Sequence, residues 1–134
     1  MNAHALYVYG TLQVPAIFEQ IVGRRLKAEP ATLEGYARYR VQARVYPAIV
    51  EQIGGRVDGL VYAGLSSTEL ARLDLYERRV VDLSRQGVEI QAHVYVLRAG
   101  QHHLLSPDAW DLDTFTRDHL NDYLSQIRVT SRAP

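Results

Sequence analysis

The sequence contains no cysteine, which excludes a disulfide framework and a thiol nucleophile. It has no run of more than two basic residues, and its 15 lysines and arginines balance its 15 acidic residues. Such a balance does not favour nucleic acid or an anionic membrane as a partner. No apolar run approaches the roughly 18 residues of a membrane span, and Met1–His4 lacks the features of a signal peptide. We therefore expect a cytoplasmic globular protein.

Patterns for metal and phosphate binding are also lacking. The five histidines are not spaced as metal ligands, and His102 and His103 stand side by side in a polar stretch where adjacent side chains diverge. No serine stands in a nucleophile-elbow context, and Gly54-Gly55-Arg56 lacks the remainder of a phosphate loop. We expect neither a metal nor a cofactor, and no pattern here indicates an oligomeric state.

Short strand-like segments dominate the chain, with a few helical segments between them. Strands are expected at 6–9, 31–50, 57–65, 79–85 and 88–98, and helices at 15–22, 66–77 and 113–127. Gly54-Gly55 is expected to form a turn, and residues 99–107 a polar loop. The pattern predicts one α+β domain over residues 1–134, in which a curled or closed mixed sheet carries helices on its outside. Its tail, from about residue 129 to 134, is expected to be frayed.

Several positions carry local signals for how these elements begin, end or pack. Pro15 suits the first position of a helix, and Gly23 suits the position after its last turn. Ser66 and Glu69 have the spacing of a capping box at the start of the next helix. Gly59 inside an expected strand indicates a bulge or the close approach of another group.

The first apolar run, Leu6–Leu12, organises the candidate site. Its leucine and valine fall on one face of the expected strand and its two tyrosines on the other. A strand that stops at Gly10-Thr11 leaves backbone N–H groups unpaired, and such a set of donors suits a carboxylate or an oxyanion. Gly10 has no Cβ and so permits close approach. The alternative is an ordinary turn.

Glu77 is the most informative carboxylate. It follows Leu70 and Leu73 at helical spacing, which predicts that all three share the inward face of one helix. Lost solvation, together with repulsion from Asp74, favours the protonated form that a general acid needs. A competing interpretation ends the helix there and turns Glu77 to solvent or to an arginine that follows.

Tyrosine is abundant, with nine in the chain. Those on expected strands could line a pocket or fill the core. They are Tyr7, Tyr9, Tyr46, Tyr62 and Tyr95.

Five segments occur in an order and at distances that are specific when taken together. They are Tyr7–Leu12, Arg44–Val50, Val57–Tyr62, Leu73–Glu77 and Ala92–Val96. In this arrangement the chain resembles the gamma-glutamylcyclotransferase-like superfamily, in its AIG2-like branch that includes the gamma-glutamylamine cyclotransferases. The resemblance extends over most of the chain.

The resemblance implies a small mixed β-barrel flanked by short helices, with a cavity at one mouth. It implies that the glutamyl group is held by Tyr9, Gly10, Thr11 and Leu12, and that Glu77 is the acid/base. Tyr46, in the second matching segment, is a further candidate for substrate binding. The implied substrate is a gamma-glutamyl amide whose free α-amine attacks its own side-chain carbonyl. The products would be 5-oxoproline and a free amine, formed without metal or cofactor.

One segment departs from the family pattern. Family members often carry a short insert with glycine and tyrosine after the glutamate, whereas here Arg78-Arg79-Val80-Val81 follows directly. The pocket wall that the tyrosine builds is therefore expected to be missing or supplied elsewhere. Two other functions stay open: a small-ligand binding domain without turnover, and an interaction module whose tyrosine-rich face binds a partner chain. The amine released from the substrate is not indicated by any segment.

Overall fold

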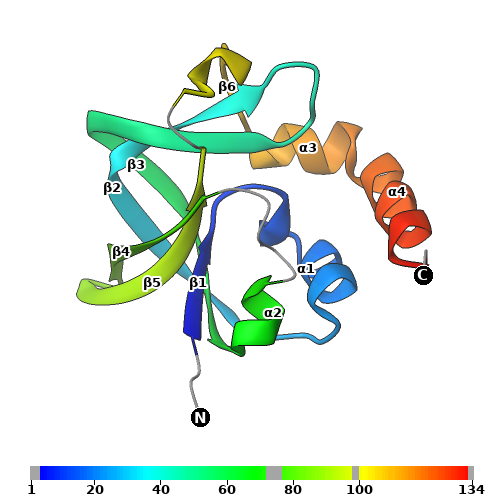
Figure 1. The fold of residues 1–134 in the computed structure, drawn as a ribbon, viewed down its shortest axis with the longest axis horizontal. Helices are drawn as coiled ribbons and strands as arrows, with labels where there is room; N and C mark the ends of the chain where they lie inside the picture. Colours follow the sequence, from blue (N-terminus) through cyan, green and yellow to red (C-terminus); the bar gives the residue numbers. More distant parts are fainter. Residues whose placement is uncertain (1–3, 72–76, 98–99, 133–134) are drawn as a thin grey trace.

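Strands form a ring with helices on its outside (Figure 1). The computed structural model describes residues 4–71, 77–97 and 100–132, with the backbone alone for residues 77, 78 and 127–132. The elements are, in chain order, β1 (His4–Val8), the 3-10 helix η1 (Thr11–Gln13), α1 (Pro15–Val22), β2 (Ala28–Val41), β3 (Pro47–Leu65), α2 (Ser67–Ala71), β4 (Glu77–Arg85), β5 (Val88–Val96), the 3-10 helix η2 (His102–Leu104), β6 (Leu105–Ala109), α3 (Leu112–Asp118) and α4 (Leu120–Arg132).

The ring runs β3–β1–β5–β4–β2 and closes because β2 also pairs with β3. The pairs are antiparallel except that of β1 with β5, which run parallel and meet at Leu6 and His93. β6 joins the far part of β2, where Val41 lies opposite Leu105. The predicted α+β fold with a closed mixed sheet is confirmed.

β1 separates two apolar layers, as its alternation predicts. Tyr7 and Tyr9 lie in the barrel interior with aliphatic side chains from four other strands, whereas Leu6 and Val8, which alternate with them, face the helices. The buried hydroxyls of the two tyrosines donate to the carbonyl oxygens of Val57 and Tyr95, each at 2.6 Å. Because an unpaired buried hydroxyl would be destabilising, these bonds fix both rings inside the barrel.

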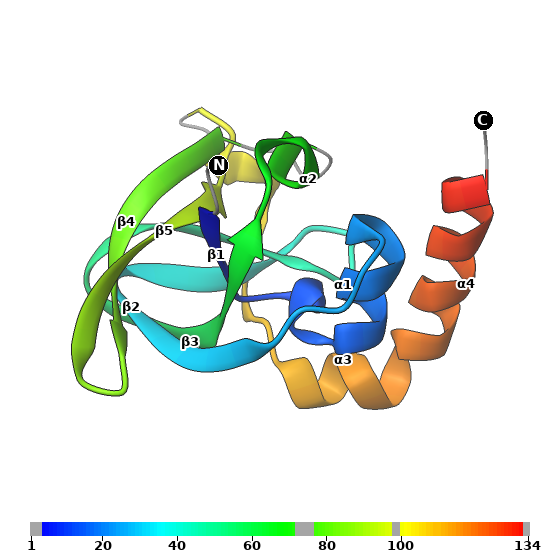
Figure 2. The same cartoon turned by 90° about the horizontal axis from the view of Figure 1, so that it is seen from below.

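Helices α1, α3 and α4 gather on one side of the barrel (Figure 2). On its barrel side, α1 stacks Phe18 on Tyr62 of β3, with ring centroids 3.7 Å apart. On its other side, Ile17 packs with Trp110 and Phe115 in a second buried group. α1 therefore lies between the barrel and the C-terminal helices, directly after the turn that ends β1.

The local helix signals are confirmed. α1 has the predicted bounds, and Gly23 follows it in the left-handed region with φ at 99°. The capping box is also present, since the Glu69 N–H donates to Ser66 Oγ at 3.1 Å and the Ser66 N–H donates to Glu69 Oε1 at 2.9 Å. Among the residues that the structure describes, no helix is long and apolar enough to cross a membrane.

The length of the second helix is predicted wrongly. Within the described residues α2 extends over Ser67–Ala71, and Glu77 is the first residue of β4. Leu73 lies between them, outside the described residues. The argument that Glu77 continues a buried helix face is therefore wrong, because the chain has changed to strand geometry by residue 77.

Three other boundaries also differ from the prediction. Gly54-Gly55 makes no turn, because β3 continues through it and bulges against β2, with Gly54 at φ 80°. The expected loop at 99–107 contains η2 and the start of β6. The C-terminal helix is two helices with His119 between them, and the second continues to Arg132 rather than ending at residue 127.

Gly59 of β3 lies against the backbone of β1. A Cβ at this position would stand 2.3 Å from the Val8 carbonyl oxygen and 2.9 Å from the Tyr7 ring, so the backbone would have to move. We expect Gly59→Ala to lower the free energy of unfolding by about 3 kcal/mol, at the upper end of overpacking effects, as measured by urea denaturation. Gly64→Ala is the control, since it has open space but a φ of 87° and should lose only about 1–2 kcal/mol. Equal losses would contradict the close approach of β1.

Candidate functional site

The turn Tyr9–Leu12 leads from the end of β1 through η1 into α1. The carbonyl of Gly10 is already occupied, because it accepts from the Gln13 N–H at 3.0 Å. In the described part of the chain, three backbone N–H groups of this turn have no hydrogen-bond acceptor. They belong to Gly10, Thr11 and Leu12. The turn therefore has unpaired backbone donors, and groups of this kind suit an anionic oxygen.

A contact within the protein leaves no room for a Cβ at Gly10. A Cβ there would lie 2.8 Å from both Cγ and Cδ of Pro47. The space that we assigned to a ligand on this side of Gly10 is filled by the proline ring. The contact instead joins the turn to the second candidate segment, Arg44–Val50, at the start of β3.

Tyr46 lies beside this contact, immediately before Pro47. Its side chain is half-buried and packs with the group formed by Val41, Ala48, Val50 and Leu97. Its carbonyl oxygen accepts from the Val41 N–H at 3.1 Å. The structure thus places Tyr46 next to the turn through Pro47, while its ring belongs to the packing between β2 and β3.

The backbone of Glu77 lies in the same region, as the first residue of β4. It pairs with Val96 of β5, which lies in the barrel interior together with Tyr9. The residue before Val96 is Tyr95, whose carbonyl accepts the Tyr9 hydroxyl. Two adjacent residues of β5 therefore contact the two candidate regions: Tyr95 bonds Tyr9 at the candidate turn, and Val96 pairs with Glu77. Glu77 itself begins β4, so no insert stands between the candidate acid/base and that strand.

Arg38 is a residue that the sequence analysis did not select. It lies on β2 and is half-buried, and its Nη1 donates to the carbonyl oxygens of Tyr9 at 2.7 Å and Asp58 at 3.2 Å. Burial lowers the pKa of Arg38, while nearby Tyr7 and Asp58 act in the opposite direction. The guanidinium charge therefore lies next to the Tyr9 carbonyl oxygen at the start of the candidate turn.

Trp110 covers this guanidinium. The Cζ atom of Arg38 lies 5.4 Å from the centroid of the Trp110 ring, within the range of a cation–π contact. The indole N–H donates to the carbonyl of Val45 at 2.7 Å. Trp110 thus connects Arg38, which holds the first candidate segment, to the second candidate segment.

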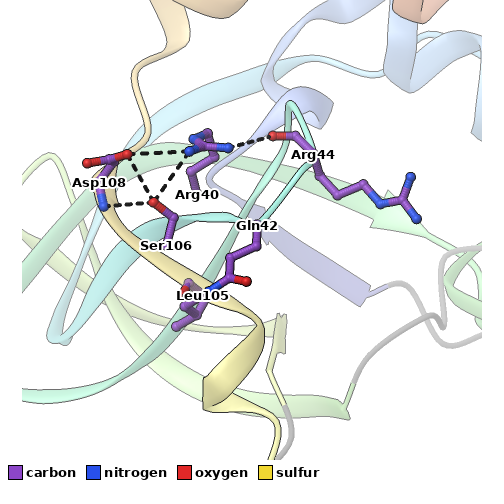
Figure 3. Close-up of polar contacts among 6 residues, drawn as sticks. All are labelled: Arg40, Gln42, Arg44, Leu105, Ser106 and Asp108. Atoms are coloured by element: carbon purple, nitrogen blue, oxygen red, sulfur yellow. Dashed lines mark hydrogen bonds and ion pairs between the residues drawn. The ribbon is translucent and has the colours of Figure 1, made fainter.

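A polar cluster fixes the strand that precedes Trp110 (Figure 3). Arg40 of β2 lies between Ser106 and Asp108 of β6 and bonds them at 3.4 and 3.3 Å. The hydroxyl of Ser106, which is buried, also donates to Asp108 Oδ2 at 3.1 Å. Figure 3 shows the guanidinium of Arg44 pointing away from this group, so the part of Arg44 that takes part is its backbone carbonyl. The cluster holds β6 against β2 and so fixes the position of Trp110, the residue that follows β6.

Side chains of β3 and α4 also hold the turn. The hydroxyl of Tyr62 on β3 donates to the Leu12 carbonyl at 3.2 Å. Thr11 Oγ1 donates to the hydroxyl of Tyr123 on α4 at 3.4 Å. The turn is thus fixed by side chains from both sides of α1.

Comparison with known proteins agrees with this architecture. Residues 6–112 match the family described as gamma-glutamyl cyclotransferase, AIG2-like. Protein AIG2 C of Arabidopsis thaliana is 30% identical over 136 residues, which cover 95% of this chain and 81% of the relative. AIG2-like protein D of the same plant is 27% identical and covers 96% of this chain and 89% of its own.

Solved structures share the fold. The solution structure of an Arabidopsis thaliana protein, 28% identical, has a TM-score of 0.72 and covers 97% of this chain and 82% of its own. A structure of a gamma-glutamyl cyclotransferase, 14% identical, has a TM-score of 0.61 and covers 95% and 87%, which shows a likeness of fold alone. With the family match across four fifths of its length, the chain belongs to the gamma-glutamyl cyclotransferase, AIG2-like family.

Proposed function

We propose that this protein cleaves a gamma-glutamyl amide by intramolecular attack of the substrate's own α-amine, releasing 5-oxoproline and a free amine. The observation that carries the proposal is that the Tyr9–Leu12 turn and Glu77 both contact β5, at adjacent residues. Tyr9 bonds the Tyr95 carbonyl, and the next residue, Val96, pairs with Glu77. Family membership supports the reaction class but names no substrate for this chain.

The reaction needs one proton carrier and one set of anion donors. As the α-nitrogen bonds to the side-chain carbonyl carbon, it loses a proton and the carbonyl oxygen becomes an oxyanion. The tetrahedral intermediate then breaks its bond to the leaving nitrogen, which must gain a proton. We assign both proton transfers to Glu77, first as base and then as acid. No water and no change of oxidation state enter the balance.

The oxyanion and the glutamyl group are assigned to the turn. Preorganised backbone donors stabilise a developing oxyanion more than its parent carbonyl. The unpaired N–H groups of Gly10, Thr11 and Leu12 supply such donors. The role of Glu77 further requires its carboxyl on the interior face of the sheet, the face to which its partner Val96 belongs.

A screen of gamma-glutamyl amines and dipeptides for release of 5-oxoproline tests the proposal directly. We expect at least one compound to be turned over, since both a proton carrier and anion donors are assigned. In a parallel titration with 5-oxoproline, we expect the amide signals of Gly10, Thr11 and Leu12 to shift. Binding at the turn without turnover of any compound would instead support the alternative, a catalytically silent ligand-binding domain. Shifts confined to another region would reject the site itself.

A further inference from the structure

We infer that Arg38 is a positioning residue for the proposed reaction: it orients the Tyr9–Gly10 peptide and strengthens the Gly10 N–H as a donor to the oxyanion. This inference rests on the proposed function. It assigns the oxyanion to a particular peptide of the turn and explains why a half-buried arginine lies behind that peptide.

The orientation follows from one short hydrogen bond. Arg38 Nη1 lies 2.7 Å from the Tyr9 carbonyl oxygen, and the same nitrogen also bonds the Asp58 carbonyl at 3.2 Å. In a trans peptide, the C=O and N–H bonds lie in one plane and point in opposite directions. With its carbonyl held by Arg38, the Tyr9–Gly10 peptide must direct the Gly10 N–H away from the guanidinium. The charge and the N–H therefore stand on opposite sides of the turn.

The strength of the donor follows from the charge on Arg38. A hydrogen bond from an ionised donor polarises its carbonyl partner, and successive hydrogen bonds through one peptide reinforce each other. Because Gly10 is buried, this polarisation acts where water screens it little. Gly10 also keeps its N–H without an acceptor among the described residues. A buried, unpaired N–H is unfavourable in the free protein, and an anionic oxygen would satisfy it.

Arg38 is itself fixed in place by Trp110. The ring covers the guanidinium at 5.4 Å, and its indole N–H is bonded to the Val45 carbonyl. Arginine stays protonated under any condition in which the fold survives, so the charge behind the turn is permanent. This arrangement fits an electrostatic and orienting role, since Arg38 bonds the turn through the backbone carbonyl of Tyr9.

The first test is spectroscopic and uses the free protein. In Arg38→Gln, we expect the carbonyl-carbon signal of Tyr9 and the amide signal of Gly10 to move upfield, because both groups lose polarisation. Arg38→Lys should restore part of each shift, since it returns a charged donor. Arg56→Gln is the matched control: among the described residues, the side chain of this exposed arginine bonds the Asp58 carboxylate, and its loss should leave both signals in place. If Arg38→Gln does not fold, the same two signals are compared between the wild-type protein and Arg38→Lys or Trp110→Phe, in which we expect smaller shifts.

The second test is kinetic, with the substrate found in the screen. Removing one oxyanion donor typically lowers kcat by about 10²–10³-fold, so weakening it in Arg38→Gln should lower kcat by roughly 10- to 100-fold. KM should change little, because the interaction strengthens only in the transition state. Unchanged signals in folded Arg38→Gln, or an unchanged kcat, would overturn the inference. Absence of turnover in the wild-type protein would overturn the proposed function, and the Tyr9 signal would still decide whether Arg38 orients the peptide.

Discussion

Glu77→Gln is expected to lower the turnover rate by about 10²–10⁴-fold, the usual contribution of general acid/base catalysis. The amide keeps the size of the side chain but can neither accept the proton of the attacking amine nor return it to the leaving nitrogen. The measurement is the rate of 5-oxoproline release under saturating substrate. Urea denaturation of the same variant shows whether the fold is retained.

Glu69→Gln is the matched control from α2, the helix before β4. Glu69 completes the capping box and pairs with Arg24 at 2.7 Å, and the hydrogen bond from Arg24 lowers the pKa of Glu69 to about 2. Its loss should lower the free energy of unfolding by a few tenths to about 1 kcal/mol and leave turnover intact. If turnover survives in Glu77→Gln, or if that variant unfolds, Glu77 has a structural role and the proposed reaction lacks its proton carrier.

N-acetylation of a cleaved gamma-glutamyl compound is expected to abolish release of its amine. The α-amine is the nucleophile in the proposed reaction, and an acetylated nitrogen is no longer nucleophilic. The experiment compares the acetylated and free compounds at equal concentration, with the released amine as the readout. The O-methyl ester of the same compound is the control, because it retains the amine. Continued release from the acetylated compound would identify a hydrolase, in which water attacks in place of the amine.

Features that depend on neighbouring residues could be predicted from the sequence. The alternation in β1 places its tyrosines inside the barrel because the period of a strand is two. The hairpin between β4 and β5 turns at Gln86-Gly87, where both residues have positive φ, at 52° and 80°. The bounds of α1 and its glycine cap follow from its own residues. Each of these features depends on residues a few positions apart, and the folded chain retains it.

Arg38 could not be found in this way, because a bulge changes the phase of β2. The register between β2 and β3 shifts between Glu34 and Tyr36, and a one-residue slip exchanges the two faces of a strand. Past the bulge, Tyr36 packs against the barrel interior and Tyr39 against another group. Arg38 is in phase with Tyr36, so an arginine that appears to alternate outward stands at the candidate turn.

Glu77 is the opposite case. This residue is selected from the sequence, but the helical position from which it is argued is wrong. Its spacing from Leu70 and Leu73 fits a helix, but the structure places Glu77 in a strand. Helical spacing within one short segment does not report where a helix stops. The position of Glu77 opposite Val96 depends on pairing with β5, nineteen residues further along the chain.

The way the turn is held has a consequence for folding. Its supports are distant in sequence: the partner of Tyr9 on β2 is 29 residues away, that of Leu12 on β3 is 50 away, and that of Thr11 on α4 is 112 away. Contacts of such separation form only after long loops have closed, which makes them late events in folding. We therefore expect the turn to gain its last support, the bond from Thr11 to Tyr123, only when α4 docks, after the barrel strands have supplied the other two.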